Sequence, residues 1–254
     1  YIPLIKCYIL EGIMGEKKKT DEGGHQALYR KYRSRKLDEI IGQDHVTITL
    51  GNAIKKGKIS HAYLLTGPRG TGKTSVARIL AHEINNLPYK DDSPHLDIIE
   101  IDAASNRRID DIRDLRDKVH IAPVSAKYKV YIIDEVHMLT NESFNALLKT
   151  LEEPPKHVIF FLATTEVHKL PATILSRTQR HSLRLATEEQ STKHLTAIAK
   201  KEAFDFEPEA LRLLAIHSGG SFRDSLSLLD QLASGGEKIT TALVELLLGV
   251  ASKN

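Results

Sequence analysis

The sequence has a single cysteine, Cys7, among its 254 residues. One thiol excludes an internal disulfide framework and any metal site built from several cysteines, and it is the usage expected in a reducing cytosol. An excess of one charge is also lacking, because 36 basic residues face 33 acidic ones and the formal net charge is only +3. The whole chain is therefore not marked as a polyanion binder, and binding to nucleic acid would need a local basic patch.

Long hydrophobic runs are missing as well. The opening residues 1–10 are apolar, but this run is too short to span a bilayer and no basic leader precedes it. Residue 1 is not Met, and a polar stretch follows Met14. We therefore expect residues 1–25 to be a flexible N-terminal extension of a cytoplasmic protein.

The chain does contain an alternation of strand and helix patterns. Short apolar runs predict buried strands at 62–65, 96–101, 128–133 and 158–163. Periodic segments predict helices at 44–56, 75–85, 107–120 and 142–152. Such alternation implies right-handed crossovers and a mainly parallel sheet covered on both faces.

After Arg180 the pattern changes to helices alone. Periodic segments at 188–200, 208–216 and 222–233 predict a small helical domain. Residues 26–36 are basic with interleaved tyrosines and are expected to be the first structured segment, for which the simplest interpretation is a solvated helix face. We therefore predict an α/β domain over residues 26–180 and a helical domain over residues 181–254.

A glycine-rich loop follows the first predicted strand. Gly67, Gly70 and Gly72 lack the Cβ atoms that would stop the backbone from wrapping a polyphosphate. Lys73 adds a positive charge, Thr74 offers a hydroxyl to Mg²⁺, and the helix that starts there points free N–H groups at the same anion. The spacing G-x-x-x-x-G-K-[ST] is met in full, which favours a triphosphate site over an ordinary glycine turn. The predicted phosphate-contacting residues are Gly67, Pro68, Arg69, Gly70, Thr71, Gly72, Lys73, Thr74 and Ser75.

An acidic pair, Asp134 and Glu135, ends the strand predicted at 128–133. Open parallel sheets place their ligands at the carboxyl ends of strands. We expect Asp134 to hold Mg²⁺ together with Thr74, and Glu135 to orient or deprotonate the water that attacks the γ-phosphate. The alternative is an acidic pair that only caps the next helix.

Further motifs carry a more specific signal. They are Glu-Ile-Asp-Ala-Ala-Ser at 100–105, Ile-Asp-Glu-Val-His-Met-Leu at 133–139, Phe-Asn-Ala-Leu-Leu-Lys-Thr-Leu-Glu-Glu-Pro-Pro at 144–155, and the segment 160–177, which ends in Ile-Leu-Ser-Arg. Together with the phosphate loop, they resemble the bacterial DNA polymerase III γ/τ family, the motor subunits of the sliding-clamp loader in the AAA+ class. The resemblance runs from about Ala27 to Gly249. It implies an α/β P-loop NTPase domain with a parallel five-stranded sheet, followed by a small helical lid.

The resemblance also assigns roles to single residues. Thr165, with Thr164 as the fallback, resembles the polar sensor between the acidic pair and the γ-phosphate. Arg177 resembles the arginine finger that reaches a neighbouring subunit's ATP, and Arg223 resembles the second sensor, which touches the ATP of its own subunit. The segment that cradles the adenine is matched by Leu28, Arg33 and Ile41. Without the resemblance, the two arginines would be taken as solvated surface residues, or Arg223 as a partner of Asp224 or Asp230.

A DNA contact is predicted at Ser105, Arg107 and Arg108, where a serine, two arginines and free N–H groups begin a predicted helix. In the family such helices line the inside of a spiral around primer-template DNA. The alternative is a capped surface helix in which Asp110 and Asp111 pair with the arginines. With roughly two or three phosphates neutralised, binding by one subunit should be weak and salt-sensitive.

Some positions depart from the family pattern. Residues 85–96 lack the four-cysteine module that members commonly insert, so zinc is not expected. Thr178 stands where a cysteine usually follows the Ser-Arg pair, and Arg33-Ser34 with Leu37 replaces the usual adenine-segment residues. The chain stops at Asn254, before the family's helical collar domain, so we expect a truncated subunit.

The resemblance implies an ATPase within a DNA-directed DNA polymerase holoenzyme that uses ATP and Mg²⁺. The implied partners are other loader subunits in a hetero-oligomeric spiral, the β sliding clamp and primer-template DNA. An arginine supplied in trans is worth about 10³ to 10⁵ in rate, so a lone monomer should hydrolyse ATP slowly. Two alternatives stay open. One is another AAA+ DNA motor, such as a branch-migration helicase or a clamp-loader small subunit, and the other is a non-hydrolysing structural subunit.

Overall fold

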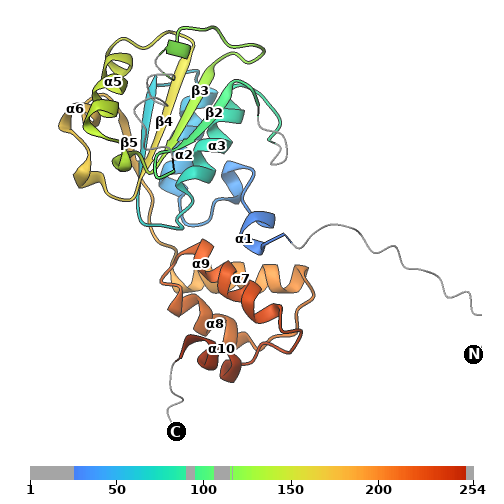
Figure 1. Cartoon of the computed structure of the whole chain (residues 1–254). Helices are drawn as coiled ribbons and strands as arrows, with labels where there is room; N and C mark the ends of the chain where they lie inside the picture. Colours follow the sequence, from blue (N-terminus) through green and yellow to red (C-terminus); the bar gives the residue numbers. More distant parts are fainter. Residues whose placement is uncertain (1–25, 90–94, 106–114, 116, 250–254) are drawn as a thin grey trace, which may run out of the picture.

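Two units make up the part of the chain that the computed structural model describes, which is residues 26–89, 95–105, 115 and 117–249. Figure 1 shows an α/β unit above and a helical unit below, connected by the segment that follows the last strand. The helical unit is called the lid from here on.

A five-stranded parallel sheet forms the centre of the α/β unit. Its strands are β1 (Ala62–Thr66), β2 (Ile98–Asp102), β3 (Lys129–Asp134), β4 (Val158–Thr164) and β5 (Gln179–Ser182). They lie in the order β2-β3-β4-β1-β5, and every neighbouring pair is parallel. β1 and β4 are buried along their whole length, as central strands covered on both faces should be. The carboxyl ends of β1, β3 and β4 therefore lie along one edge of the sheet.

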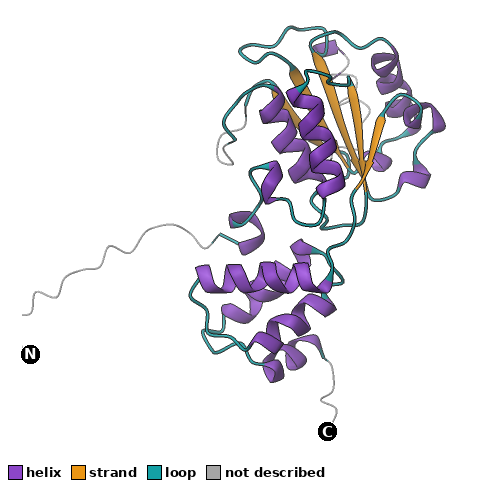
Figure 2. Ribbon diagram, turned by 180° about the vertical axis from the view of Figure 1, so that it is seen from behind, coloured by secondary structure: helices purple, strands orange, loops and turns teal. Residues whose placement is uncertain are grey.

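Helices cover both faces of this sheet. α2 (Asp44–Lys55) and α3 (Lys73–Ile84) pack on one face, which Figure 2 shows in front of the strands. α5 (Asn141–Glu152) and α6 (Ala172–Leu175) pack on the other. Because successive strand residues point to opposite faces, Leu64 packs in the core between the sheet and α5 and α6, whereas Leu65 packs in the core between the sheet and α2 and α3. Three short 3₁₀ turns complete this unit: η1 (Leu37–Glu39), η2 (Val136–Met138) and η3 (Val167–Lys169).

The lid is a bundle of helices with its own apolar core. Its helices are α7 (Glu188–Lys201), α8 (Pro208–His217), α9 (Phe222–Ala233) and α10 (Thr241–Leu248). Thr187 and Gln190 form a reciprocal capping box at the start of α7, and Ser221 caps α9. Proline at the first position of α8 suits a helix start, because its missing N–H would have no partner there.

The short helix α1 (Leu28–Lys31) comes before the sheet in sequence but packs on the lid. Leu28 is part of the lid core. Lys31 Nζ lies 2.6 Å from a carboxylate oxygen of Glu202, to which the Tyr32 hydroxyl also donates. Burial, together with the Glu202 carboxylate, raises the pKa of Tyr32 to about 12, so this phenol keeps its proton at neutral pH. α1 therefore links the start of the α/β unit to the lid.

Strand β5 spans residue 180, where the sequence predicts the end of the α/β domain. Its residues are polar, so no apolar run marks this strand in the sequence. Residues 26–36 contain α1 with its buried Leu28, so this segment is not solvated along its whole length. Helix α10 is an addition to the predicted elements. Most of the helix predicted at 107–120 lies outside the described residues, as do residues 90–94 of the zinc-module segment.

Candidate nucleotide-binding and catalytic site

The loop between β1 and α3 has the backbone that its glycines predict. Gly67, Gly70 and Gly72 have positive φ angles of 145°, 76° and 92°. A Cβ on Gly67 would lie 2.4 Å from the carbonyl oxygen of Leu183, and one on Gly70 would lie 1.9 Å from Ser221 Oγ. These glycines therefore let the loop curl, and they also let the end of the sheet and the start of α9 approach it.

Lys73 begins α3 and is 6 % exposed. Its Nζ donates hydrogen bonds to the carbonyl oxygens of Gly67 and Pro68, at 3.0 and 2.9 Å. Burial lowers the pKa of this amine, while the carboxylates of Glu135 and Asp134 act in the opposite direction. A buried ammonium group at the start of a helix, held by neutral carbonyls, fits the negative charge of a phosphate.

A cavity of about 760 Å³ lies between this loop and the lid. The residues predicted to bind ATP or Mg²⁺ that line it are Arg33, Ile41, Arg69, Gly70, Thr71, Gly72, Lys73, Thr74, Ser75, Asp134, Glu135 and Arg223. Three of the predicted residues do not line the cavity. Lys73 Nζ bonds the carbonyl oxygens of Gly67 and Pro68, and Leu28 is buried in the lid core. The volume is in the range of small-molecule and cofactor sites, so the cavity can hold a nucleotide.

Thr74 and Asp134 meet at the side of this cavity. Thr74 Oγ1 donates a hydrogen bond to Asp134 Oδ2 at 2.5 Å, although the residues lie on α3 and β3. The other carboxylate oxygen, Oδ1, accepts from the backbone N–H of Glu135 at 2.9 Å. A hydroxyl beside a carboxylate is the kind of oxygen set that Mg²⁺ prefers, so these residues fit the predicted metal.

Glu135 adopts a left-handed backbone conformation, with φ of 46°. Non-glycine residues rarely adopt this conformation, and those that do are found more often at functional sites. Its Oε2 accepts hydrogen bonds from Thr165 Oγ1 at 3.0 Å and from Thr165 N at 3.3 Å. Thr164, the fallback for the sensor role, is fully buried and instead lies 3.0 Å from His137 Nδ1. The structure thus brings Thr165, and not Thr164, to the acidic pair.

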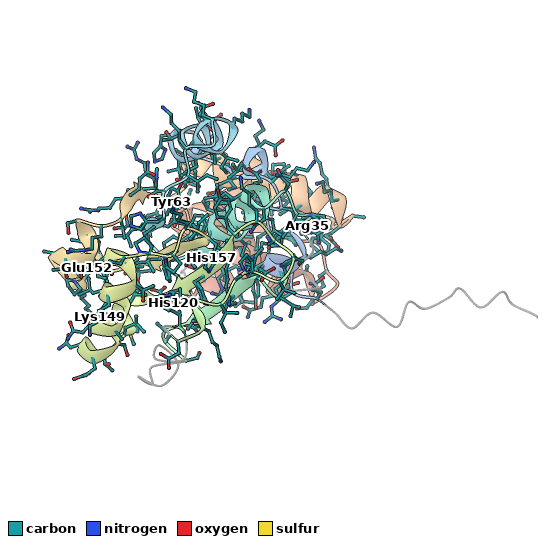
Figure 3. The ribbon with its side chains drawn as sticks, turned by 90° about the horizontal axis from the view of Figure 1, so that it is seen from above. Arg35, Tyr63, His120, Lys149, Glu152 and His157 are labelled. Carbon is teal, nitrogen blue, oxygen red and sulfur yellow. The ribbon has the colours of Figure 1, made fainter. Side chains whose placement is uncertain are left out.

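Arg177 does not join the cavity. Its guanidinium lies 2.7 Å from Glu152 Oε1 and donates to the carbonyl of Thr173 at 3.0 Å. Residues 33 and 34 line the cavity, and Arg35 follows them directly. Figure 3 shows Arg35 on one side of the molecule and Glu152, the partner of Arg177, on the other. Arg177 is therefore held away from the nucleotide cavity of its own chain.

Arg223 reaches the cavity from the first turn of α9. Its guanidinium carbon lies 5.2 Å from the ring centroid of Tyr29, a cation–π distance, and both residues line the cavity. Arg223 thus meets the N-terminal segment of the chain at the wall of the cavity.

Of the residues predicted to contact DNA, the structure describes Ser105 alone. Ser105 is exposed, and its Oγ donates to Asp102 Oδ2 at 2.7 Å. Arg107 and Arg108 lie outside the described residues. The DNA contact remains a prediction.

Sequence reasoning missed Tyr29 and His137. Tyr29 lies between Leu28 and Arg33 of the predicted adenine segment, and it lines the cavity. His137 lies 3.4 Å from Glu135 Oε2. Its position two residues after the acidic pair's Glu135 is the signal that could have singled it out.

The fold and the site together define the class of protein. A parallel β2-β3-β4-β1-β5 sheet, a phosphate loop after β1, an acidic pair after β3 and a helical lid are the features of an AAA+ P-loop NTPase. The Thermotoga maritima RuvB Holliday junction branch migration motor superposes with a TM-score of 0.66 over 87% of this chain and 74% of that chain. The two are 24% identical, so this likeness shows the fold. AAA+ proteins bind nucleotide, usually with Mg²⁺.

Sequence comparisons narrow this class. Residues 42–187 match the family described as "DNA polymerase III, delta subunit", and residues 190–237 match "DNA polymerase III clamp loader subunit, ATPase lid domain". The tau subunit of Bacillus subtilis DNA polymerase III is 47% identical over 244 residues, covering 90% of this chain and 43% of that protein. The Escherichia coli tau subunit is 47% identical over 89% of this chain and 37% of that protein. The chain belongs to the bacterial DNA polymerase III γ/τ family of clamp-loader subunits.

The chain spans less than half the length of these two tau relatives. The gamma subunit of Buchnera aphidicola (subsp. Acyrthosiphon pisum) is 42% identical and is covered over 63% of its length. Within the described part of this chain, none of the helices has the length and hydropathy needed to cross a bilayer.

Proposed function

We propose that this chain is an ATP-hydrolysing motor subunit of a bacterial clamp loader, which opens the β sliding clamp and loads it onto primer-template DNA. The observation that carries the proposal is the meeting of Lys73, Thr74, Asp134 and Glu135 at one cavity. Lys73 and Thr74 begin α3, whereas Asp134 ends β3 and Glu135 follows it, and each of the four has the chemistry that ATP hydrolysis needs. The sequence relatives supply the clamp-loader context.

Each residue has a distinct part in the proposed reaction. Lys73 and the loop N–H groups bind the phosphates of the substrate. Thr74 and Asp134 would hold Mg²⁺, which offsets negative charge on the phosphates when it is bound. Glu135 orients the attacking water and accepts its proton, and Thr165 fixes the carboxylate that does so.

The position of Arg177 supports action between subunits. Held by Glu152 away from its own cavity, it is suited to a neighbour's ATP site in a spiral of loader subunits. In the proposed cycle, ATP binding orders the spiral and opens the clamp, and DNA contact then triggers hydrolysis and release. Arg177 would supply positive charge to the transition state formed at the next site.

Replacement of the phosphate-loop lysine tests the proposal. In a reconstituted loader that carries the full-length subunit, Lys73→Ala should abolish ATP binding and DNA-stimulated ATPase, because it removes the buried positive charge. Lys200→Ala removes an exposed lysine from α7 and serves as the control. Unchanged ATP binding and ATPase in Lys73→Ala would reject the assignment.

Replacement of the acidic residue distinguishes a motor from a non-hydrolysing structural subunit. Glu135→Gln keeps the shape of the side chain but removes the proton acceptor, so hydrolysis should fall by about 10² to 10⁴ while bound ATP is retained. ATP turnover and filter-bound nucleotide would be measured on the same assembly. A purely structural subunit would show no change in either.

The rival motor function has less support. The RuvB likeness extends to the fold at 24% identity, whereas the tau relatives share 47% identity over most of this chain. A stable hexamer that moves DNA strands would nevertheless favour a branch-migration role.

A further inference from the structure

His137 connects the proposed water-activating glutamate with the end of β4. The ring lies in η2, and its side chain is 6 % exposed. Nδ1 lies 3.0 Å from Thr164 Oγ1 and 3.4 Å from Glu135 Oε2, while Nε2 lies 3.1 Å from Glu166 Oε2. No step of the function proposed above uses this ring.

Thr164 and Glu166 contact the two nitrogens of the ring. Thr164 Oγ1 accepts a hydrogen bond from the backbone N–H of Glu166 at 3.0 Å, and the same hydroxyl is hydrogen-bonded to Nδ1 of His137, also at 3.0 Å. Nε2 lies 3.1 Å from Glu166 Oε2, which also pairs with Lys169 Nζ at 2.6 Å. Both ring nitrogens therefore have a polar partner from the end of β4.

The ring thereby holds the residues on both sides of Thr165. Thr164 is hydrogen-bonded to one ring nitrogen, and the Glu166 carboxylate lies 3.1 Å from the other, so the ring contacts the turn at both ends. That turn presents Thr165, whose N–H and hydroxyl both donate to Glu135 Oε2. The orientation of the Glu135 carboxylate therefore depends on a turn that His137 holds.

The same arrangement separates the two oxygens of the Glu135 carboxylate. Oε2 accepts from both donors of Thr165 and also lies 3.4 Å from His137 Nδ1. Among the described residues, none donates a hydrogen bond to Oε1. Oε1 is thus the oxygen available to accept a proton.

We propose that His137 is a positioning residue for ATP hydrolysis, which acts through Thr164, Thr165 and Glu166 to orient the carboxylate of Glu135. The inference rests on the proposed function, because it requires Glu135 to act on water. Small displacements of a catalytic group can lower a rate by about 10²-fold. Loss of the His137 ring should therefore lower kcat and leave ATP binding unchanged.

Two replacements of the ring test this role in the full-length subunit, assembled with its loader partners, clamp and primer-template DNA. His137→Phe keeps a flat ring without its nitrogens and should lower kcat by about 10- to 100-fold, with the KM for ATP changed by less than about twofold. His137→Asn offers an amide group to Thr164 but is too short to reach Glu166, so its kcat should fall less than that of His137→Phe. The matched control is His157→Phe, because His157 bonds the carbonyl of Val119 at 3.1 Å just before β4, at the opposite end of that strand from Thr164.

The outcomes separate this inference from the proposed function. A parent assembly without ATPase activity would reject the proposed function itself. If the parent is active, an unchanged kcat in His137→Phe, or a raised KM at unchanged kcat, would overturn the positioning role. Should His137→Phe fail to assemble, an unchanged kcat in His137→Asn would overturn it instead.

Discussion

Asp97 shows how a single buried carboxylate orders a loop of the backbone. It is 1% exposed, and it accepts hydrogen bonds from the backbone N–H groups of Val124, Ser125 and Ala126 at 2.7 to 2.9 Å. Burial acts to raise its pKa, but these three donors hold the pKa below its usual value. The side chain of Asp97 therefore fixes the backbone of residues 124–126, which lead into β3.

We expect Asp97→Asn to destabilise the protein by about 2 kcal/mol at neutral pH, because an amide oxygen is a weaker acceptor than a carboxylate. The carboxylate's contribution is fully present above the unfolded pKa of about 3.9 and is lost as the pH falls through the lower folded pKa. Urea unfolding from pH 7 downward should thus show the parent and the variant converging in acid. The exposed Asp205→Asn is the control, and a constant difference at every pH would contradict the prediction.

At the scale of elements, the turn between α8 and α9 positions the lid against the phosphate loop. Ser221 caps α9 beside Gly70, and the backbone of Gly220 accepts a hydrogen bond from Ala186 N at 3.1 Å. Arg223 follows directly in the first turn of α9. The tight approach of two backbones at Gly220 therefore sets where Arg223 enters the cavity.

Two adjacent glycines allow a matched test of this turn. Gly219 and Gly220 both have positive φ, but a Cβ on Gly220 would lie 2.4 Å from the Ala186 carbonyl oxygen, whereas nothing lies within 4 Å of one on Gly219. Gly219→Ala should cost about 1 kcal/mol of stability from its φ alone. Gly220→Ala should cost more and also weaken ATP binding several-fold, as measured by denaturant unfolding and ATP titration. Equal effects of the two variants would show that the contact with Ala186 is unimportant.

At the scale of the whole molecule, the chain carries a nucleotide cavity and a separate arginine directed elsewhere. Arg177 and Glu152 are 33% and 49% exposed, so their ion pair is worth about 0 to 1 kcal/mol and can be exchanged for a stronger partner. A neighbouring subunit's phosphates would be such a partner. The proposed active centre is thus shared between two chains.

Co-assembly of two inactive variants tests this sharing. Arg177→Ala should lower the ATPase rate of the assembled loader by about 10³-fold or more, and Lys73→Ala disables the cavity instead. Loaders assembled from both variants together should regain part of the activity, because some interfaces pair an intact cavity with an intact arginine. Arg212→Ala, which breaks an exposed ion pair on the lid, is the control for Arg177→Ala. A mixture as inactive as each variant alone would contradict action in trans.

Much of the fold and the centre of the site could be predicted because their signals are local. The bounds of β1, β3, β4 and of α7, α8 and α9 agree with the apolar patterns to within a residue or two, since burial imposes its period on neighbouring residues. The polar strand β5 carries no such pattern, because it lies at the edge of the sheet and pairs with β1. The side chain of Leu28, which the resemblance places in the adenine segment, packs in the lid core.

The sequence by itself determined the phosphate loop, the acidic pair and the alternation that implies a parallel sheet, because each depends on residues close together in the chain. The sequence predicted that Thr74 and Asp134 share one site, but only the tertiary structure decided that they form a direct hydrogen bond, that His137 contacts both sides of the Thr165 turn, and that Arg177 pairs with Glu152. These contacts join residues 60, 27 and 25 positions apart. Local patterns contain no information on such pairings, because the packing of separate elements creates them.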